Sequence, residues 1–485
     1  MQRMHTATFA LILMFLIAPF GQNDRVGRQL DDDETANAGA LIRASKLTPA
    51  KHRLSEDTVT LQRALDAAAG QVLVIPPGHY TLTAQLRVPQ GTTVFANEAT
   101  LDFSRFSGKA ITNEGSDFTW RGGRIIGSGG DVYNGRDHGF AIEGSRGPNG
   151  ATPPKYAHNI LIDGVEVRGF GYAGIWLSNV RNVELSNNKL IGLGYAGILG
   201  TSVVNASIER NLVDRVKGKG APDTYGIAID RLEDTLVRDP PSRNVRIRYN
   251  TITNIPNWEA IDTHGGIDFD ISHNQISKTR FGIAIVGSDI GSKVALGAKN
   301  VRVANNIIEG SSGGAAIVVA GAMTGAVVND YASDIQILDN QIFGGGAADD
   351  ASEGSIRVYG TNRVHIRRNV IRGPYAIGIN IISDNQALEV SGNTIIDVRN
   401  PTDAVFPRMI GISGSNNTGK IFDNTFELRN RFAAKHVATF SIVTVSGLTG
   451  LDLTFGPHAF VGRRGSLLAT RFETTRGVIL AQLRE

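Results

Sequence analysis

Residues 182–190 read NVELSNNKL, a short alternation of apolar and polar residues that reaches Asn and resumes with an apolar residue two places later. The same pattern returns as NASIERNLV (205–213), NVRIRYNTI (244–252), NVRVANNII (300–308), DIQILDNQI (334–342), RVHIRRNVI (363–371) and ALEVSGNTI (387–395). A period of two indicates a β-strand, because successive side chains of a strand point to opposite faces. Recurrence every 23 to 39 residues predicts a solenoid whose coils differ in loop length.

A second strand pattern lies between these copies, as AGIWLS (173–178), AGILGT (196–201), YGIAID (225–230), FGIAIV (281–286), GSIRVY (354–359) and IGINII (377–382). Each coil therefore has at least two strands, joined by turns of Gly and Asn, which tolerate positive φ. The units lack a 3.6-residue period, which excludes helical and leucine-rich repeats. The sequence predicts an all-β fold, a single-stranded right-handed parallel β-helix over residues 51–426. We interpret the recurring Asn as structural, bonded from coil to coil.

The two ends of the solenoid need covers. Residues 57–70, DTVTLQRALDAAAG, predict an amphipathic helix capped by Asp57 that covers the first coil. Residues 427–485 lose the repeat and are expected to form a C-terminal cap.

The amino terminus predicts export. Residues 1–21 carry Arg3 and then an apolar run of about 14 residues, shorter than the ~20 that span a bilayer. This is the layout of a secretory signal peptide, so we expect a periplasmic or secreted protein with no membrane span after cleavage. Residues 22–50, with an acidic run at 31–34, are expected to be a linker.

Composition narrows the partners. The chain has 49 Lys and Arg against 46 Asp and Glu, a balance that argues against a nucleic-acid partner. It has no Cys, so disulfides do not stabilise it.

Residues 57–103, which include VLVIPPGHYTL (72–82), resemble the start of the pectate lyase superfamily domain found in rhamnogalacturonase-like and epimerase-like proteins. Together with the repeat pattern up to about residue 426, the resemblance implies a right-handed β-helix that acts on polysaccharides. The fold alone does not give the reaction.

Aligning the second strands on their shared Gly-Ile gives a map of the outer surface. In YGIAID, Ile227 and Ile229 point inward and Asp230 points outward. The same register places Asp262 and His264 of EAIDTH (259–264) outward. Adjacent coils lie ~4.8 Å apart and alternate residues of a strand ~6.7 Å apart, so these three outward side chains meet. We take them as the candidate catalytic residues.

The strip around this cluster is otherwise made of small apolar residues, on which a flat substrate can lie. Longer loops border it, as is common at the binding face of a solenoid. Seven residues are candidates for binding substrate along this strip: Arg231, Arg280, Trp176, Trp258, Arg357, Tyr359 and Tyr225.

The cluster suits β-elimination from, or epimerisation of, a uronic acid. Such a reaction needs a base beside the carboxylate, an acid, and a positive charge that neutralises the carboxylate. His264 titrates near neutral pH, and Asp230 and Asp262 would orient it. Arg231, Arg280 or a Ca²⁺ ion held by the Asp pair would supply the positive charge.

A second resemblance concerns EAIDTH itself. The stretch is similar to the tyrosine–x–phenylalanine–aspartate–proline–histidine stretch of mannuronan epimerases, whose catalytic aspartate and histidine match Asp262 and His264. Glu259 stands in place of the tyrosine and Thr263 in place of the proline. The match implies that this surface is the active one.

Two alternatives remain open from the sequence. Asp230 and Asp262 come out ~8 Å apart, within the ~6.5–9.5 Å range of inverting glycoside hydrolases. Hydrolysis by this Asp pair is therefore the first alternative. The second alternative is a non-catalytic, glycan-binding β-helix. The leading hypothesis is an exported enzyme acting on an acidic polysaccharide.

Overall fold

The computed structural model describes residues 42–43, 54–427, 441–446, 452–456, 458–461 and 483–484, without 131, 222, 232–234, 289–293, 312, 326, 345–352, 374–376 and 397–407. The expected signal peptide and linker lie outside the described residues, apart from a two-residue strand. Within the described part, no helix is long and apolar enough to cross a membrane.

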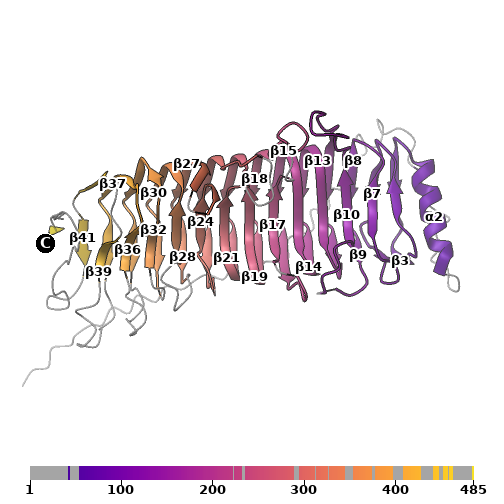
Figure 1. The fold of residues 1–485 in the computed structure, drawn as a ribbon. Helices are drawn as coiled ribbons and strands as arrows, with labels where there is room; N and C mark the ends of the chain where they lie inside the picture. The colour runs from indigo at the N-terminus through magenta and orange to yellow at the C-terminus, as the bar shows by residue number, and fades with distance from the viewer. Residues whose placement is uncertain are drawn as a thin grey trace, which may run out of the picture.

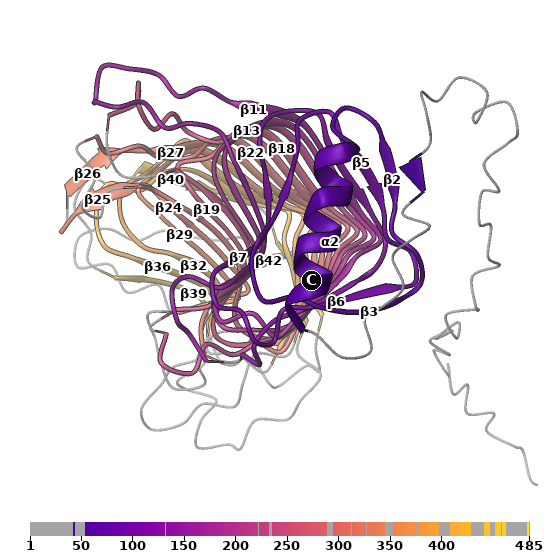
Figure 2. The ribbon, with the colours of Figure 1, turned by 90° about the vertical axis from the view of Figure 1, so that its right-hand side faces the viewer.

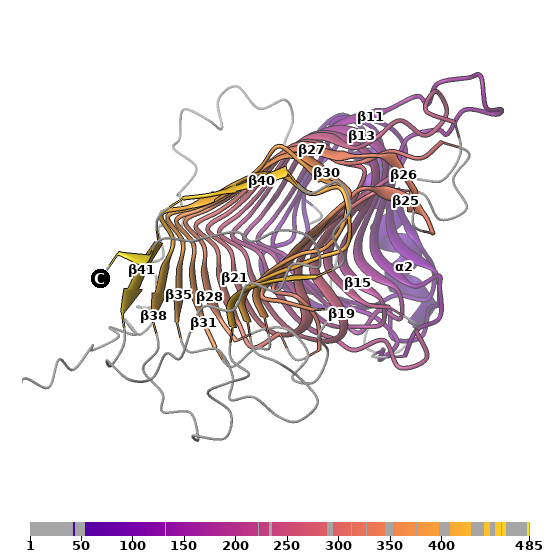
Figure 3. The ribbon, with the colours of Figure 1, turned by 60° about the vertical axis from the view of Figure 1, so that its left-hand side comes forward.

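Parallel strands stack along one axis and form a single hydrogen-bonded sheet that winds around three sides of an elongated body (Figure 1). Viewed from near either end, the coils lie one behind another around a common interior (Figures 2 and 3). Each complete coil contributes one strand to each side and so has three strands, where the sequence predicted at least two. We call the sides faces A, B and C.

Face A contains β1 (Ile42–Arg43), β2 (Val72–Val74), β5 (Thr93–Phe95), β8 (Phe118–Arg121), β11 (Ala157–Asp163), the second parts of β13 (Ala173–Ser186) and β15 (Ala196–Glu209), β18 (Arg243–Arg248), β20 (Ile267–Ser272), β22 (Lys299–Ala304), β27 (Ala332–Leu338), β30 (Thr361–Arg367), β33 (Asn385–Gln386), β34 (Leu388–Ser391), β37 (Thr418–Phe422) and β40 (Asp452–Phe455).

Face B contains β3 (Gly78–Thr81), β6 (Ala99–Asp102), β9 (Arg124–Ile126), β12 (Glu166–Arg168), β14 (Lys189–Leu193), β16 (Leu212–Val216), the first parts of β19 (Thr251–His264) and β21 (Gln275–Val286), β23 (Ile307–Glu309), β28 (Gln341–Phe343), β31 (Val370–Arg372), β35 (Thr394–Ile396), β38 (Thr425–Glu427), β41 (His458–Val461) and β42 (Leu483–Arg484).

Face C contains β4 (Leu86–Val88), β7 (Lys109–Asn113), β10 (His138–Glu143), the first parts of β13 and β15, β17 (Tyr225–Asp230), the second parts of β19 and β21, β24 (Ile317–Ala320), β29 (Ile356–Tyr359), β32 (Ile377–Ile381), β36 (Arg408–Ser413) and β39 (Ser441–Ser446). Strands β25 (Ala322–Thr324) and β26 (Val327–Asp330) form a separate antiparallel hairpin.

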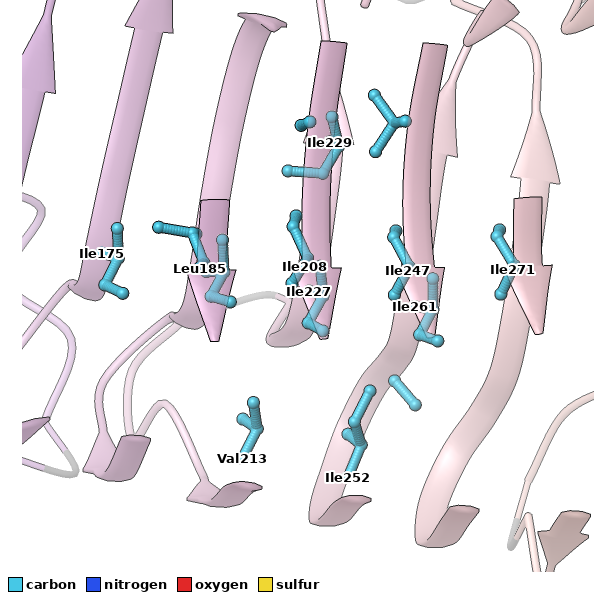
Figure 4. Packing of buried hydrophobic residues seen from close by; sticks show 14 of the residues in the cluster. Ile175, Leu185, Ile208, Val213, Ile227, Ile229, Ile247, Ile252, Ile261 and Ile271 are labelled. Carbon is cyan, nitrogen blue, oxygen red and sulfur yellow. The ribbon is translucent and has the colours of Figure 1, made fainter. Parts of the chain in front are cut away.

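The interior is a stack of aliphatic side chains in register. Ile198 pairs with Ile227 and Ile227 with Ile261 on successive coils, and all three are fully buried. Figure 4 shows such side chains pointing inward from neighbouring strands. Burial of each contributes about 1.5–3 kcal/mol, so the repeated inward Ile, Val and Leu account for the stability of the stack.

The recurring Asn forms a buried ladder. Asn211 Nδ2 donates to Asn250 Oδ1 at 3.0 Å and to the Leu185 carbonyl at 2.9 Å, and the same two bonds recur from coil to coil. The ladder joins Asn188, Asn211, Asn250, Asn274, Asn306, Asn340, Asn369, Asn393 and Asn424. This confirms that these residues are structural.

Helix α2 (Leu54–Ala67) covers the amino-terminal end of the stack, where Leu61 and Leu65 are fully buried (Figure 2). The helix begins three residues before Asp57, so the prediction that Asp57 is its N-cap is wrong. The Asp57 carboxylate instead accepts a hydrogen bond from the Thr81 amide at 2.9 Å, which ties the helix to β3.

Parallel stacking continues past residue 426. Strands β39, β40 and β41 pair in parallel with β36, β37 and β38, each on its own face. The rest of the expected C-terminal cap lies outside the described residues and stays a prediction.

Candidate active site

The outward register predicted for face C is the one in the structure. Leu199 pairs with Ala228, Ala228 with Asp262, and Asp262 with Ala284. The recurring inward Ile positions fix this register, because slipping by one residue would turn every aliphatic side chain out of the core. The candidate residues therefore lie on the outer surface of face C, near the middle of the stack.

The three candidate catalytic residues lie together. His264 Nε2 is 3.3 Å from Asp262 Oδ2, and the His264 backbone amide donates to Asp230 Oδ1 at 2.9 Å. The Asp262 side chain is fully buried, whereas the His264 side chain is 30% exposed and Asp230 is half-buried. Asp262 thus lies behind the imidazole, and His264 and Asp230 are the groups that a substrate can reach.

Two further carboxyl groups join the cluster. Glu259 is 6% exposed and lies beside Tyr225 in the register, and Asp223 precedes β17 in a loop. The sequence analysis gave Glu259 no role beyond standing in place of the epimerase tyrosine. It gave no sign of Asp223, because a loop has no period that fixes a register. Both interact electrostatically with Asp262 and His264.

The cluster leaves buried oxygens without hydrogen bonds. Asp262 Oδ1 and Glu259 Oε2 have no hydrogen-bond partner within the described part of the chain, and Asp262 Oδ2 has only the ion pair with His264 at 3.3 Å. An unsatisfied buried polar group costs about 1–3 kcal/mol, more when it is charged. Such groups are rare in folded proteins and gather at functional sites.

Burial and mutual charge move the proton affinities of the cluster. Burial, with the Asp262 charge, raises the pKa of Asp230 to about 7 and that of Glu259 well above its ordinary value. Burial would lower the pKa of His264, but the charges of Asp262, Asp230 and Glu259 outweigh it and raise that pKa well above 6.5. Near neutral pH, His264 is therefore protonated and Asp230 gains and loses a proton.

Tyr225 stands at the edge of the cluster as a neutral phenol. Burial raises its pKa, and the neighbouring Asp262 raises it further. Its hydroxyl therefore stays protonated and does not act as a base.

A calcium ion does not fit this arrangement. No group of three or more His, Asp or Glu side chains among the described residues has a geometry that holds a metal ion. Asp230 accepts the His264 amide and Asp262 faces the imidazole, so the Asp pair does not form a calcium cage.

Arg280 and Trp258 form a stacked pair beside the cluster. The Arg280 guanidinium carbon lies 4.8 Å from the centre of the Trp258 ring, and the Arg280 side chain is exposed. Burial raises the pKa of Asp223, and the positive charge of Arg280 offsets part of that rise. The structure thus brings two of the predicted substrate-binding residues to the edge of the cluster, together with Tyr225.

Arg231 faces the loops instead. It is 4% exposed, and its Nη1 donates to Ser288 Oγ at 2.9 Å and to the Val294 carbonyl at 2.8 Å. These bonds tie the loop after β17 to the loop after β21. Arg231 is thus buried among these loops, and its predicted substrate-binding role stays a prediction.

Trp176 and Arg357 lie at equal distances on opposite sides of the cluster. Three steps of the register, about 14 Å, separate each of them from Asp262. Arg357 is ion-paired to Glu353 and lies over the Tyr359 ring at 5.2 Å. The structure places these three predicted residues along the same surface but outside the cluster.

Apolar patches flank the cluster on both sides along the axis. The first consists of Ala173, Ala196, Leu199 and Ala228 with Tyr172, Trp176, Tyr195 and Tyr225. The second consists of Phe281, Ala284, Ala315 and Val318 with Trp258, Val286 and Tyr359. The charged cluster therefore divides the apolar strip on the outer surface of face C into two patches.

Three solved structures resemble the chain at low sequence identity. Pre-mature gene product 12 of bacteriophage phi29 is 13% identical, with a TM-score of 0.51 over 89% of this chain and 58% of that one. The chain thus spans less than two thirds of the phage protein's length. A family 28 exopolygalacturonase of Yersinia enterocolitica is 15% identical, with a TM-score of 0.49 over 77% of both chains. The catalytic unit of a family 87 α-1,3-glucanase of Streptomyces thermodiastaticus is 16% identical, with a TM-score of 0.43 over 89% of this chain and 70% of that one.

At these identities, similarity bears on the fold and not on the activity. No curated protein sequence matches the chain. The family model described as the right-handed β-helix region matches residues 128–330 and 237–395, together more than half of the chain. With one continuous parallel sheet on three faces, the chain belongs to the right-handed β-helix family.

Proposed function

We propose that the protein is a carbohydrate-active enzyme that acts on an acidic polysaccharide by β-elimination or epimerisation, with His264 as acid and Asp230 as base. The observation that carries this proposal is the fully buried Asp262 carboxylate held 3.3 Å behind the partly exposed His264, with the buried Glu259 carboxyl group in the same cluster. A cluster of buried carboxyl groups with strongly shifted pKa values, placed in the middle of an apolar strip, supports catalysis over a purely structural role.

The two reachable groups suit acid–base chemistry. The base takes the proton from the sugar carbon next to the carboxylate, and Asp230, with a pKa of about 7, can accept it near neutral pH. In β-elimination the electron pair then forms a carbon–carbon double bond and expels the glycosidic oxygen, which takes a proton from His264. In epimerisation a proton instead returns to the carbon from the opposite face.

Arg280 supports an acidic substrate. Its exposed guanidinium lies 4.8 Å from the centre of the Trp258 ring at the edge of the cluster, from where its N–H groups can bind a uronate carboxylate. The positive charge would stabilise the carbanion-like state that forms when the neighbouring proton leaves.

Hydrolysis of a glycosidic bond is the second candidate. Asp262 cannot be one of two carboxylates that contact the sugar, because its side chain is fully buried. The half-buried Asp223, whose pKa burial raises, is the observation that keeps hydrolysis in consideration as a second carboxyl group.

Product analysis distinguishes these reactions. Purified protein is incubated with polygalacturonate, alginate, glucuronan and α-1,3-glucan, and ultraviolet absorbance and reducing ends are followed together. Rising absorbance with new reducing ends identifies a lyase, and a changed uronate composition by NMR without cleavage identifies an epimerase. Reducing ends without absorbance would assign a hydrolase. Glycan binding without any product would make the protein a binding β-helix and overturn the proposal.

We also propose that the protein is exported and processed near residue 21. Support comes only from the charged and apolar pattern of residues 1–21. The mass of the protein recovered from the periplasm or medium tests this, since an intact amino terminus would contradict it.

A further inference from the structure

We propose that Lys109, Glu143 and Trp176 form a second, non-catalytic subsite on face C, which binds a pyranose ring of the same glycan through its hydroxyl groups and its apolar ring face. The inference rests on the proposed function, because it extends the substrate from the catalytic cluster toward the amino-terminal end of the stack.

The three side chains hold one another in a fixed arrangement. Trp176 Nε1 donates to Glu143 Oε1 at 3.1 Å, and the Lys109 ammonium is ion-paired with Glu143 Oε2. The Glu143 backbone is held as well, since its amide donates to Asn113 Oδ1 at 2.9 Å and its carbonyl accepts from Asn113 Nδ2 at 3.3 Å. A preorganised site of this kind loses little conformational freedom when it binds a ligand.

A buried histidine lies against the tryptophan. The His138 ring centre is 5.9 Å from that of Trp176, and the residue is 6% exposed. Burial and the Lys109 charge lower its pKa to about 4, so the imidazole is neutral. Its Nδ1 has no hydrogen-bond partner within the described residues, the same departure that marks the catalytic cluster.

The subsite lies in register with the catalytic cluster. Glu143 pairs with Ser178, Ser178 with Thr201, and Thr201 with Asp230. Three coil spacings, about 14 Å, therefore separate Glu143 from Asp230 on the same outward column. The residues between them are small and nearly buried, so they leave the surface clear for one extended chain that contacts both places.

Both edges of this connecting surface are lined. Tyr172 and Tyr195 are stacked with ring centres 4.8 Å apart, and Tyr225 continues the row at 5.4 Å from Tyr195. This row leads from Trp176 to the edge of the catalytic cluster.

Two loops line the opposite edge, the one after Glu143 and the one after Asp230. Arg146 Nε donates to Asp239 Oδ1 at 2.6 Å, and Arg238 Nε donates to the Gly147 carbonyl at 2.7 Å. The two loops are therefore joined into one border that runs from the subsite to the cluster.

The residue types indicate the ligand. An indole ring offers a flat apolar surface, which complements the C–H face of a pyranose, and keeps a polar edge for orientation. The charges of Lys109 and Glu143 offset each other, so the pair binds hydroxyl groups as donor and acceptor rather than selecting a carboxylate. The ligand class is thus a sugar residue of an extended glycan, several residues away from the reacting one.

Binding measured without turnover tests the subsite. Oligogalacturonates, oligomannuronates and gluco-oligosaccharides of two to seven residues are titrated by calorimetry into the His264→Ala variant, with and without Trp176→Ala. We expect Trp176→Ala to weaken binding of the long oligomers about tenfold and to leave disaccharides unchanged. Tyr249→Ala, which removes an exposed aromatic residue on another part of the surface, serves as the matched control and should bind as the parent does.

Glu143→Gln provides a second variant that keeps size and fold. Glu143→Gln should weaken the binding of long oligomers in the same way, because the neutral amide pairs less strongly with Lys109 and holds Trp176 less firmly. Equal affinity of the parent and Trp176→Ala for every length would overturn the subsite, as would the absence of binding by any probe to the parent. A length-dependent loss in a protein that turns over no polysaccharide would leave the subsite standing and remove the proposed function.

Discussion

His264 and Asp230 are both reachable from the outer surface of face C and shifted in proton affinity. The structure places Asp262, fully buried, behind the imidazole at 3.3 Å. In the proposed reaction, the buried Asp262 would act on the substrate only through His264. Asp262 is therefore a positioning residue. This division of roles follows from burial, which the sequence pattern does not report.

Replacing Asp262 with Asn tests that role. The change keeps the shape but removes the main charge that raises the pKa of His264, so that pKa should fall. NMR titration of the His264 ring measures the shift directly, and turnover should fall about a hundredfold or more. An unchanged titration of His264 would show that Asp262 does not set its charge.

The pH dependence of stability reports on Asp230. Its pKa is raised from 3.8 to about 7, so between these values the folded state holds a proton that the unfolded state has lost. The stabilisation is complete below pH 3.8 and is lost as the pH rises through about 7. Asp230→Asn should therefore flatten the fall of the melting temperature across this range, as calorimetry at a series of pH values would show. An equal slope in both proteins would contradict the shifted pKa.

The rate should depend on pH through the same group. Asp230 must be ionised to act as a base, so turnover should rise as the pH rises through about 7. A rate that falls through pH 7 would instead assign Asp230 as the acid.

At the scale of strands and loops, the strands were predictable and the loops were not. The pairing of Ala228 with Asp262 and of Asp262 with Ala284 follows from a two-residue period anchored on recurring inward Ile. Asp223 and the partners of Arg231 lie in loops of unequal length, where no period fixes a position. The start of α2 was also missed, since Asp57 bonds to the Thr81 amide and the helix begins at Leu54.

The loop border should depend on Arg146. Its partner Asp239 is fully buried, so Arg146→Ala removes the positive charge that is paired with a buried carboxylate. We expect a loss of about 2–3 kcal/mol in the free energy of unfolding, below the value for a fully buried pair because Arg146 is partly exposed. Chemical denaturation measures it, and Arg363→Ala, which breaks the exposed pair with Asp334, should change little. Equal effects of the two variants would show that the border is not held by this pair.

Removing a side chain from the buried Asn ladder should lower the free energy of unfolding more than removing one from an exposed row of Asn residues. Asn250→Ala deletes donors to Asn274 Oδ1 and the Ile208 carbonyl, and the acceptor of Asn211. Leaving these buried groups unbonded should cost at least about 3 kcal/mol. Asn205→Ala, in a parallel but exposed row, is the control and should cost much less. Similar denaturation midpoints for the two variants would contradict the ladder's role.

At the scale of the whole molecule, the solenoid provides one long outer surface on face C along which the proposed substrate would lie. The catalytic cluster lies midway between Trp176 and Arg357 on one straight surface, with an apolar patch on each side. The fold class was predictable because every coil repeats the same pattern. The proposed reaction was not predictable, because it would depend on a few residues of two adjacent coils that depart from the pattern.

Turnover of acidic polysaccharide by the unmutated protein and by His264→Ala is the most direct measurement of the central claim. The account predicts that the unmutated protein forms unsaturated or epimerised uronates from at least one of polygalacturonate, alginate and glucuronan. His264→Ala, shown to be folded by circular dichroism, should lose this activity by about a hundredfold or more. Undiminished turnover by a folded His264→Ala protein would contradict the claim that this cluster is the active site.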